Sequence, residues 1–155
     1  MEKTVSQSKT EMSQLMMPQH ENFGGTIYGG AILSIADSVA YVCAARHAGP
    51  HCVTVSVDRV DFHEPIRVGE LLTFLASINY VGHSSMEVGI KIVSENLKNG
   101  AKRHTNSCYF TLVYLDDQGR PKEVPRLVPE TADEKRRFEA GRKRREAAKV
   151  LYKKQ

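Results

Sequence analysis

The chain has 155 residues, a length that suits one globular domain. Hydrophobic residues make up 41% of it, and the formal net charge at pH 7 is +4. No apolar run approaches the ~20 residues of a membrane-spanning helix, and residues 1–14 lack the apolar core of a signal peptide. We therefore expect a soluble, cytoplasmic protein without a membrane partner.

The first thirty residues are expected to hold little regular structure. Residues 1–14 are polar and mixed in charge, which predicts a flexible lead-in to a main domain over residues 15–129. A short extended segment is expected at 15–17, before Pro18. Residues 19–30 contain two Gly-Gly pairs, which disfavour both helix and strand and so predict a loop.

Residues 31–47 predict one long helix that is apolar around most of its circumference and therefore buried. Asp37 is the only charged residue between positions 30 and 45. The four residues Ser34, Asp37, Ser38 and Tyr41 recur at helical spacing and form one narrow polar stripe. The pattern leaves two interpretations open, a stripe that faces water and a stripe that lines a functional groove.

The pattern changes to strands after Ala48-Gly49-Pro50, a helix stop. Alternating or apolar runs predict strands at 52–60, 71–80, 86–95 and 101–115, with turns between them. Four antiparallel strands have one face to cover, and the buried helix is the natural cover. The exposed sheet edges and the apolar helix favour a dimer in which both meet across a two-fold axis.

The C-terminal residues 130–155 are basic and predict a separate helix over 133–153. They hold ten Lys or Arg and five Asp or Glu, whereas the preceding residues are nearly neutral. Such a run can bind nucleic acid, but interleaved Glu and Ala favour a solvated helix face, so no nucleic-acid partner is expected.

The sequence offers no pattern for a metal, a cofactor or an alternative nucleophile. Cys43, Cys52 and Cys108 have no metal-ligand spacing, and their apolar settings predict buried free thiols. The six histidines show no HExxH, and no serine lies in a GxSxG motif. We expect no metal site and no resident cofactor.

Several short motifs, in order over about 20–145, resemble those of the hot-dog-fold acyl-CoA thioesterases, the type that includes brain acyl-CoA hydrolase and its single-domain bacterial relatives. The residues that carry the resemblance are His20-Glu21-Asn22, Gly29-Gly30, Asp37, Arg46-His47, Val68-Gly69-Glu70, Gly82-His83-Ser84-Ser85, Ser94-Glu95-Asn96, Gly100-Ala101-Lys102 and Gly141-Arg142-Lys143-Arg144.

The resemblance implies an α+β hot-dog fold, an antiparallel sheet wrapped around a long central helix. It implies hydrolysis of fatty acyl-CoA, with coenzyme A entering only as part of substrate and product. The family's catalytic pair maps onto Asn22 of one subunit and Asp37 of the other, so a homodimer would carry two equivalent sites. The family also implies trimers of such dimers, that is, hexamers.

The chemistry of the residues gives each candidate a role. Asp37 would act as general base to a water or as a nucleophile, and Asn22 would orient water or substrate unless it only forms an Asx turn. The N–H of Gly30, with that of Ala31, would stabilise the oxyanion at the helix start. Expected coenzyme A ligands are Ser84, Ser85, Arg67, Arg59, Lys102 and Arg103.

Three other functions compete with hydrolysis as readings of the sequence. A non-catalytic acyl-CoA sensor is the alternative, although the presence of both Asn22 and Asp37 argues against it. A nucleic-acid binder lacks an aromatic platform. A hot-dog dehydratase would need a catalytic histidine where the helix offers Asp37.

Overall fold

The computed structural model describes residues 1–153, apart from the side chain of Tyr152. A five-stranded antiparallel sheet forms its centre, in the order β2-β4-β5-β6-β3. The strands are β2 (Thr10–Leu15), β3 (Cys52–Asp58), β4 (Glu70–Val81), β5 (Ser85–Asn96) and β6 (Lys102–Tyr114). Short strands β1 (Glu2–Thr4) and β7 (Arg126–Val128) pair in parallel beside it, and 3-10 turns η1 (Val5–Gln7) and η2 (Pro18–His20) flank β2.

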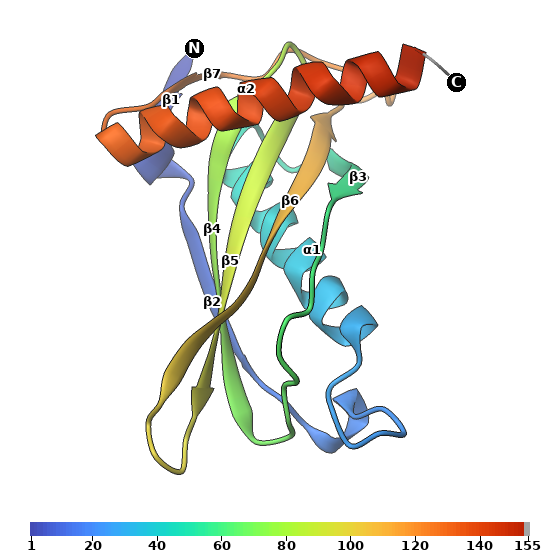
Figure 1. Cartoon of the computed structure of the whole chain (residues 1–155). Helices are drawn as coiled ribbons and strands as arrows, with labels where there is room; N and C mark the ends of the chain where they lie inside the picture. Colours follow the sequence, from blue (N-terminus) through green and yellow to red (C-terminus); the bar gives the residue numbers. More distant parts are fainter. Residues whose placement is uncertain (154–155) are drawn as a thin grey trace.

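The long helix α1 (Gly29–His47) packs on one face of this sheet, where it forms the core (Figure 1). Alternate residues of β4, β5 and β6 point toward it and are buried, Phe74 and Phe110 being the largest. On its side of this contact, the helix carries small side chains, among them Ala36, Ala40 and Ala44, none of which is exposed to solvent. Small residues let the helix axis approach a twisted sheet closely, and the curved strands wrap around it.

The second helix, α2 (Ala132–Lys153), crosses the opposite face of the sheet near one end (Figure 1). The ring of Phe138 meets that of Tyr80 edge-on at 5.1 Å between centroids. A Cβ atom added at Gly141 would lie 2.9 Å from the Cβ atom of Tyr80, so a glycine here lets α2 lie close to β4. The helix predicted over 133–153 is confirmed, and one side of it packs on the sheet.

The α+β hot-dog architecture and the four predicted strands are confirmed, whereas the prediction for residues 1–14 was wrong. These residues contain β1 and β2, and β2 pairs with β4 from Thr10↔Ala76 to Leu15↔Leu71. Most side chains of β2 are exposed, so the segment lacks the apolar alternation that predicts a strand. Its place is determined by backbone bonds to the edge of β4, about sixty residues away in sequence.

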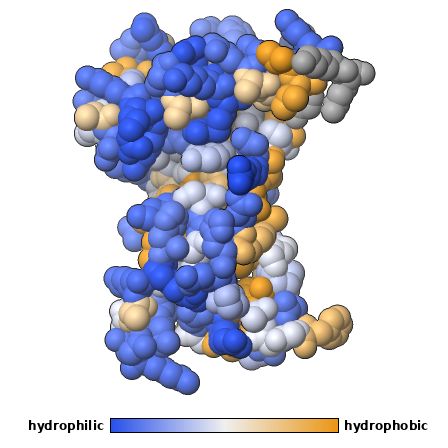
Figure 2. Space-filling view, viewed as in Figure 1, coloured by the Kyte–Doolittle hydropathy of each residue, from blue (hydrophilic) through white to orange (hydrophobic). Residues whose placement is uncertain are grey.

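Strand β3 forms the other edge of the sheet and carries a bulge at Val55. On one side of the bulge Thr54 opposes Leu112, whose buried side chain faces α1. Because directly opposed residues share a face, Thr54 also points toward α1. Val53, Val55 and Val57 are each 44–56% exposed, and Figure 2 shows apolar atoms along this side of the molecule.

Candidate active site

Asp37 lies near the middle of α1 on its outward face. The polar stripe formed by Ser34, Asp37, Ser38 and Tyr41 is exposed in the single chain, whereas the neighbouring Ala36, Val39 and Ala40 are buried. The structure thus directs the only acid of the helix interior away from the core of its own subunit. A carboxylate in this position keeps its hydration until a ligand or another chain covers it.

Thr54 of β3 holds the Asp37 carboxylate, a contact that the sequence did not predict. The Thr54 hydroxyl donates a hydrogen bond of 2.7 Å to Oδ1 of Asp37. The contact depends on the register at the Val55 bulge, because a shift of one residue would turn a valine toward the carboxylate instead. In the sequence, Thr54 is only one of the polar residues that alternate with valines in V-T-V-S-V, so nothing marks it out from Ser56.

Asn22 forms a compact Asx turn within its own loop. Its Oδ1 accepts bonds from the Gly24 and Thr26 N–H groups at 2.8 and 3.2 Å, and its Nδ2 donates to the Thr26 hydroxyl at 3.0 Å. The Asx turn that the sequence left open is therefore formed. Asn22 remains exposed, and no bond joins it to Asp37 within the chain as described, residues 1–153.

The start of α1 leaves the Gly30 N–H open. Tyr28 is the N-cap residue and supplies no side-chain cap, and the Gly30 N–H has no partner in residues 1–153. The Ala31 N–H instead donates to the Tyr28 carbonyl at 3.1 Å. Ala31 as a second oxyanion donor is thus contradicted, because its proton is already used in the first turn of the helix.

Aromatic rings crowd the same helix start. A Cβ atom at Gly29 would lie 3.1 Å from the Phe62 ring, and one at Gly30 would lie 3.2 Å from the Tyr28 ring. Phe62 and Tyr28 are 47% and 44% exposed, and Phe23 in the preceding loop is fully exposed. Glycine at these positions lets apolar rings lie directly against backbone N–H groups, which creates an apolar rim around an electropositive helix end.

The expected coenzyme A ligands lie at opposite ends of β4. Arg67 precedes this strand and the Gly82–Ser85 turn follows it, a separation of about 40 Å at ~3.3 Å per residue. Ser85 is buried at the start of β5, and Ser84 is partly exposed. Arg59, exposed and paired with Asp61, follows β3, and Lys102 begins β6 near the Arg67 end. One subunit therefore does not bring the two groups together.

Arg103 is engaged in a network that ties down the loop between β3 and β4. Its guanidinium pairs with the Glu64 carboxylate and donates to the Pro65 carbonyl at 2.6 Å and to Glu70 at 3.2 Å. Burial would raise the pKa of Glu70, but hydrogen bonds from the Arg67 N–H, Ser94 and Arg103 outweigh it and lower that pKa. The same loop bonds to the Asn22 loop, since the Ile27 N–H donates to the Ile66 carbonyl at 2.7 Å.

The three cysteines are free and buried, as predicted. Burial raises the pKa of Cys43 to about 12 and that of Cys52 and Cys108 to about 11, so each thiol stays protonated and a poor nucleophile. Within residues 1–153, no group of three or more His, Cys, Asp or Glu side chains could hold a metal ion. Neither described helix is both long and apolar enough to span a membrane.

Residues 24–101 match the model of the thioesterase superfamily. Protein VdlD of Helicobacter pylori is 50% identical over 92% of this chain and 82% of its own length. The mouse cytosolic acyl coenzyme A thioester hydrolase is 38% identical over 91% of this chain, which spans only 38% of that protein.

Solved structures show the same similarity over almost the whole chain. An apo-hexameric acyl-CoA thioesterase superposes with a TM-score of 0.92 at 36% identity, over 97% of both chains. The acyl-CoA hydrolase of Staphylococcus aureus has been solved in complex with butyryl coenzyme A, coenzyme A and coenzyme A disulfide. It superposes with a TM-score of 0.88 at 36% identity, over 98% of this chain and 94% of its own. Further structures of that enzyme carry alanine in place of one aspartate, one asparagine or one threonine. With its sheet wrapped around α1, the chain therefore belongs to the thioesterase superfamily and carries the hot-dog fold of its acyl-CoA hydrolases.

Proposed function

We propose that this thioesterase hydrolyses fatty acyl-CoA to a free fatty acid and coenzyme A, with Asp37 as its catalytic carboxylate. The observation that carries the proposal is the Asp37 carboxylate, exposed on the outward stripe of a helix whose other face is buried, and held by the Thr54 hydroxyl at 2.7 Å. A hydrogen bond to one oxygen fixes the rotamer and leaves the other oxygen for a water or a thioester carbonyl.

The variants of the Staphylococcus aureus enzyme support the choice of residues. Its substituted asparagine, aspartate and threonine occur in the same order and at the same intervals as Asn22, Asp37 and Thr54 in this chain. These equal intervals, in an enzyme 35% identical over 98% of this chain, support a correspondence between the three residues and Asn22, Asp37 and Thr54. Thr54 joins the proposed site on this ground and on its bond to Asp37.

In the reaction, water adds its oxygen to the thioester carbonyl, and the carbon–sulfur bond breaks to give a carboxylic acid and the thiol of coenzyme A. As general base, Asp37 would take the proton of the water and return it to the departing sulfur. As nucleophile, it would displace the coenzyme A thiolate to form an anhydride. Water then opens the anhydride, which restores the carboxylate and supplies the proton that the thiolate takes up. The open Gly30 N–H, at the positive end of α1, would stabilise the oxyanion. Water is the only other reactant, so no cofactor is needed.

A homodimer would complete the site. The exposed stripe of α1 and the unpaired edge of β3 lie on one side of the molecule, and the apolar Val53, Val55 and Val57 line that edge. A second copy on this surface would bury these valines and bring its Asn22 loop toward Asp37. The hexameric relative, with its TM-score of 0.92, supports a hexamer built from such dimers. We propose the cytosol as its compartment, as in the name of the mouse relative.

A dimer could also bring the separated candidate residues together around one coenzyme A molecule, because opposite ends of β4 can contact the same ligand when they come from different subunits. The hydroxyls of Ser84 and Ser85 and the charges of Arg59, Arg67 and Lys102 are proposed contacts for the phosphates. Arg103 is the weakest candidate, since its guanidinium is occupied by Glu64, Glu70 and Pro65.

Thiol release from a series of acyl-CoAs tests the proposal. Asp37→Asn keeps the shape of the side chain and removes the base, so we expect a fall of roughly 100-fold to 10,000-fold in kcat. Asp133→Asn, an exposed carboxylate on α2, is the matched control and should hydrolyse normally. Unchanged hydrolysis in Asp37→Asn would refute the assigned role, and tight acyl-CoA binding without any turnover in the wild type would favour a sensor.

A further inference from the structure

A cavity of about 680 Å³ lies between the first half of α2 and the outer face of the sheet, the face opposite α1. Gly141 brings α2 into close contact with β4, and beside this contact the strands and helix carry small residues that leave space. These are Ser77, Ser107 and Ala140. The volume is within the usual range for small-molecule sites.

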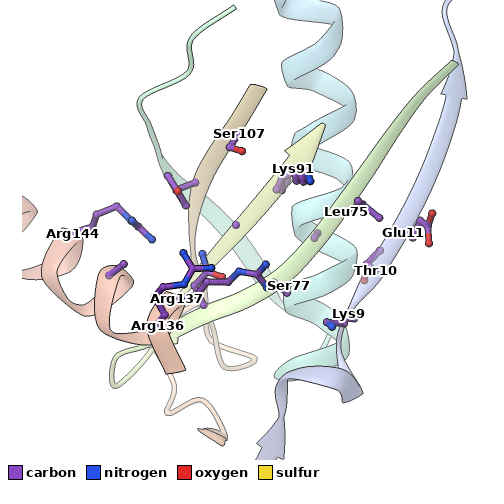
Figure 3. Close-up of a pocket in the computed structure, with 16 residues that line it drawn as sticks. Lys9, Thr10, Glu11, Leu75, Ser77, Lys91, Ser107, Arg136, Arg137 and Arg144 are labelled. Carbon is purple, nitrogen blue, oxygen red and sulfur yellow. The ribbon is translucent and has the colours of Figure 1, made fainter. Parts of the chain in front are cut away.

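The walls of this cavity are strongly basic. Lys9, Lys91, Arg136, Arg137 and Arg144 line it, and Glu11 is its one carboxylate. Figure 3 shows Arg136 and Arg137 reaching from α2 over the strands toward Ser77, with Lys91 on the neighbouring strand. Positively charged side chains that line the same cavity repel one another unless an anion lies between them. The arrangement therefore favours an anionic ligand.

Internal partners neutralise only part of this charge. Arg144 donates two bonds to Glu87, at 2.7 and 3.0 Å, and Arg136 pairs with Asp133. Within residues 1–153, the side chains of Lys9, Lys91 and Arg137 make no hydrogen bond or ion pair. Glu134 lies near Lys9 and Arg137, but it is buried and accepts bonds from the backbone N–H groups of residues 130 and 131.

Arg144 gives the cavity a rigid, flat wall. Its guanidinium stacks over the Tyr109 ring at 3.8 Å and is held in its plane by the two bonds to Glu87. Asn79 donates to the same carboxylate at 3.1 Å, and a Cβ atom at Gly89 would collide with the Asn79 amide. A guanidinium held in this way is a preorganised surface for a planar group, in contrast to the long and flexible side chains of Lys9 and Lys91.

From this cavity we infer a second ligand site, which binds a phosphate-bearing small molecule of up to nucleotide size. Arg137, Lys91 and Lys9 take the phosphate oxygens, and the stacked Arg144 faces the rest of the ligand. The site lies across the sheet from α1, so it is separate from Asp37 and Thr54 of the same chain. Two sources share this chemistry: a free phosphorylated effector and the nucleotide end of coenzyme A.

Binding of pyrophosphate and of ADP to the intact wild-type protein, measured by calorimetry, tests the site without any turnover. We expect binding that weakens steeply with salt, about tenfold weaker pyrophosphate binding in Arg137→Ala or Lys91→Ala, and about a hundredfold loss in the double variant. Lys143→Ala removes an exposed charge of α2 outside the cavity and should change affinity less than twofold. Lys91→Glu, at an exposed strand position, is a second variant that should keep the fold.

No binding by the wild type, or equal affinity in the wild type, Lys91→Glu and the double variant, would overturn the inference. The source of the ligand follows from kinetics. If coenzyme A occupies the site, pyrophosphate competes with acyl-CoA and Arg137→Ala raises KM. If the ligand is a separate effector, coenzyme A does not displace pyrophosphate and Arg137→Ala leaves KM unchanged. Because binding needs no hydrolysis, its failure is distinguishable from failure of the Asp37 mechanism.

Discussion

The Thr54 hydroxyl and the Asp37 carboxylate are joined by a hydrogen bond of 2.7 Å that connects the edge strand β3 to the exposed face of α1. The hydroxyl donates, so the bond holds the carboxylate in one orientation. The two residues come from different elements, and a bulge in β3 determines that a threonine rather than a valine faces the acid.

Removing this hydroxyl should therefore slow the reaction without unfolding the protein. Thr54→Val keeps the shape of the side chain and should lower kcat about tenfold to a hundredfold, because the carboxylate loses its fixed orientation. Thr54→Ser should restore most of the rate, since it keeps the donor. Initial rates at saturating acyl-CoA check this. Equal rates for the valine and serine variants would show that the hydroxyl has no part in the reaction.

Gly30→Ala tests the helix start. The new Cβ atom would lie 3.2 Å from the Tyr28 ring and beside the open N–H, so we expect kcat/KM to fall about tenfold with little loss of stability. Gly119→Ala is the control. Its φ of 76° strains a remote turn, and it should lower the melting temperature while the rate per folded molecule stays normal. Normal kcat/KM in Gly30→Ala would exclude the oxyanion role.

Arg103→Ala tests whether this arginine serves the fold rather than the substrate. We expect a loss of about 1–2 kcal/mol in the free energy of unfolding, a moderate value because the side chain is 34% exposed, and a looser loop between β3 and β4. Lys102→Ala, at the exposed neighbouring position, should leave stability unchanged. Denaturant unfolding measures both. An unchanged midpoint with a raised KM for acyl-CoA would instead assign Arg103 to coenzyme A.

The buried His47 should lower the free energy of unfolding in acid. It is fully buried, its Nε2 bonds to the Pro125 carbonyl at 2.8 Å, and burial lowers its pKa. As pH falls through ~6.5, His47 therefore becomes protonated in the unfolded chain before it does so in the native chain. The stability that depends on neutral His47 is fully present above this pH and decreases below it.

The melting temperature should accordingly drop between about pH 7 and about pH 5, and His47→Gln should flatten the drop. His83→Gln, at an exposed turn, should keep the wild-type slope. Equal slopes in the wild type and His47→Gln would place the sensitivity elsewhere.

Much of the fold could be predicted because its elements carry local patterns. The apolar run of α1 and the alternation in β4 to β6 identify them within two residues at each end. Strand β2 could not be predicted, since its exposed side chains show no period and its partner lies far along the chain. For the candidate site, Asp37 and Gly30 stood out as unusual residues in their segments. Thr54 did not, because only the bulge in β3 turns it toward the acid.

The pairing of β1 with β7 has a consequence for how the chain acquires its structure on the ribosome. Residues 2–4 are synthesised before their hydrogen-bond partners, residues 126–128, and more than a hundred residues lie between the two segments. Until β7 emerges, β1 has no partner strand, and the nascent chain exposes its unsatisfied backbone groups. Chains stalled before β7 should accordingly be the ones that depend most on chaperones.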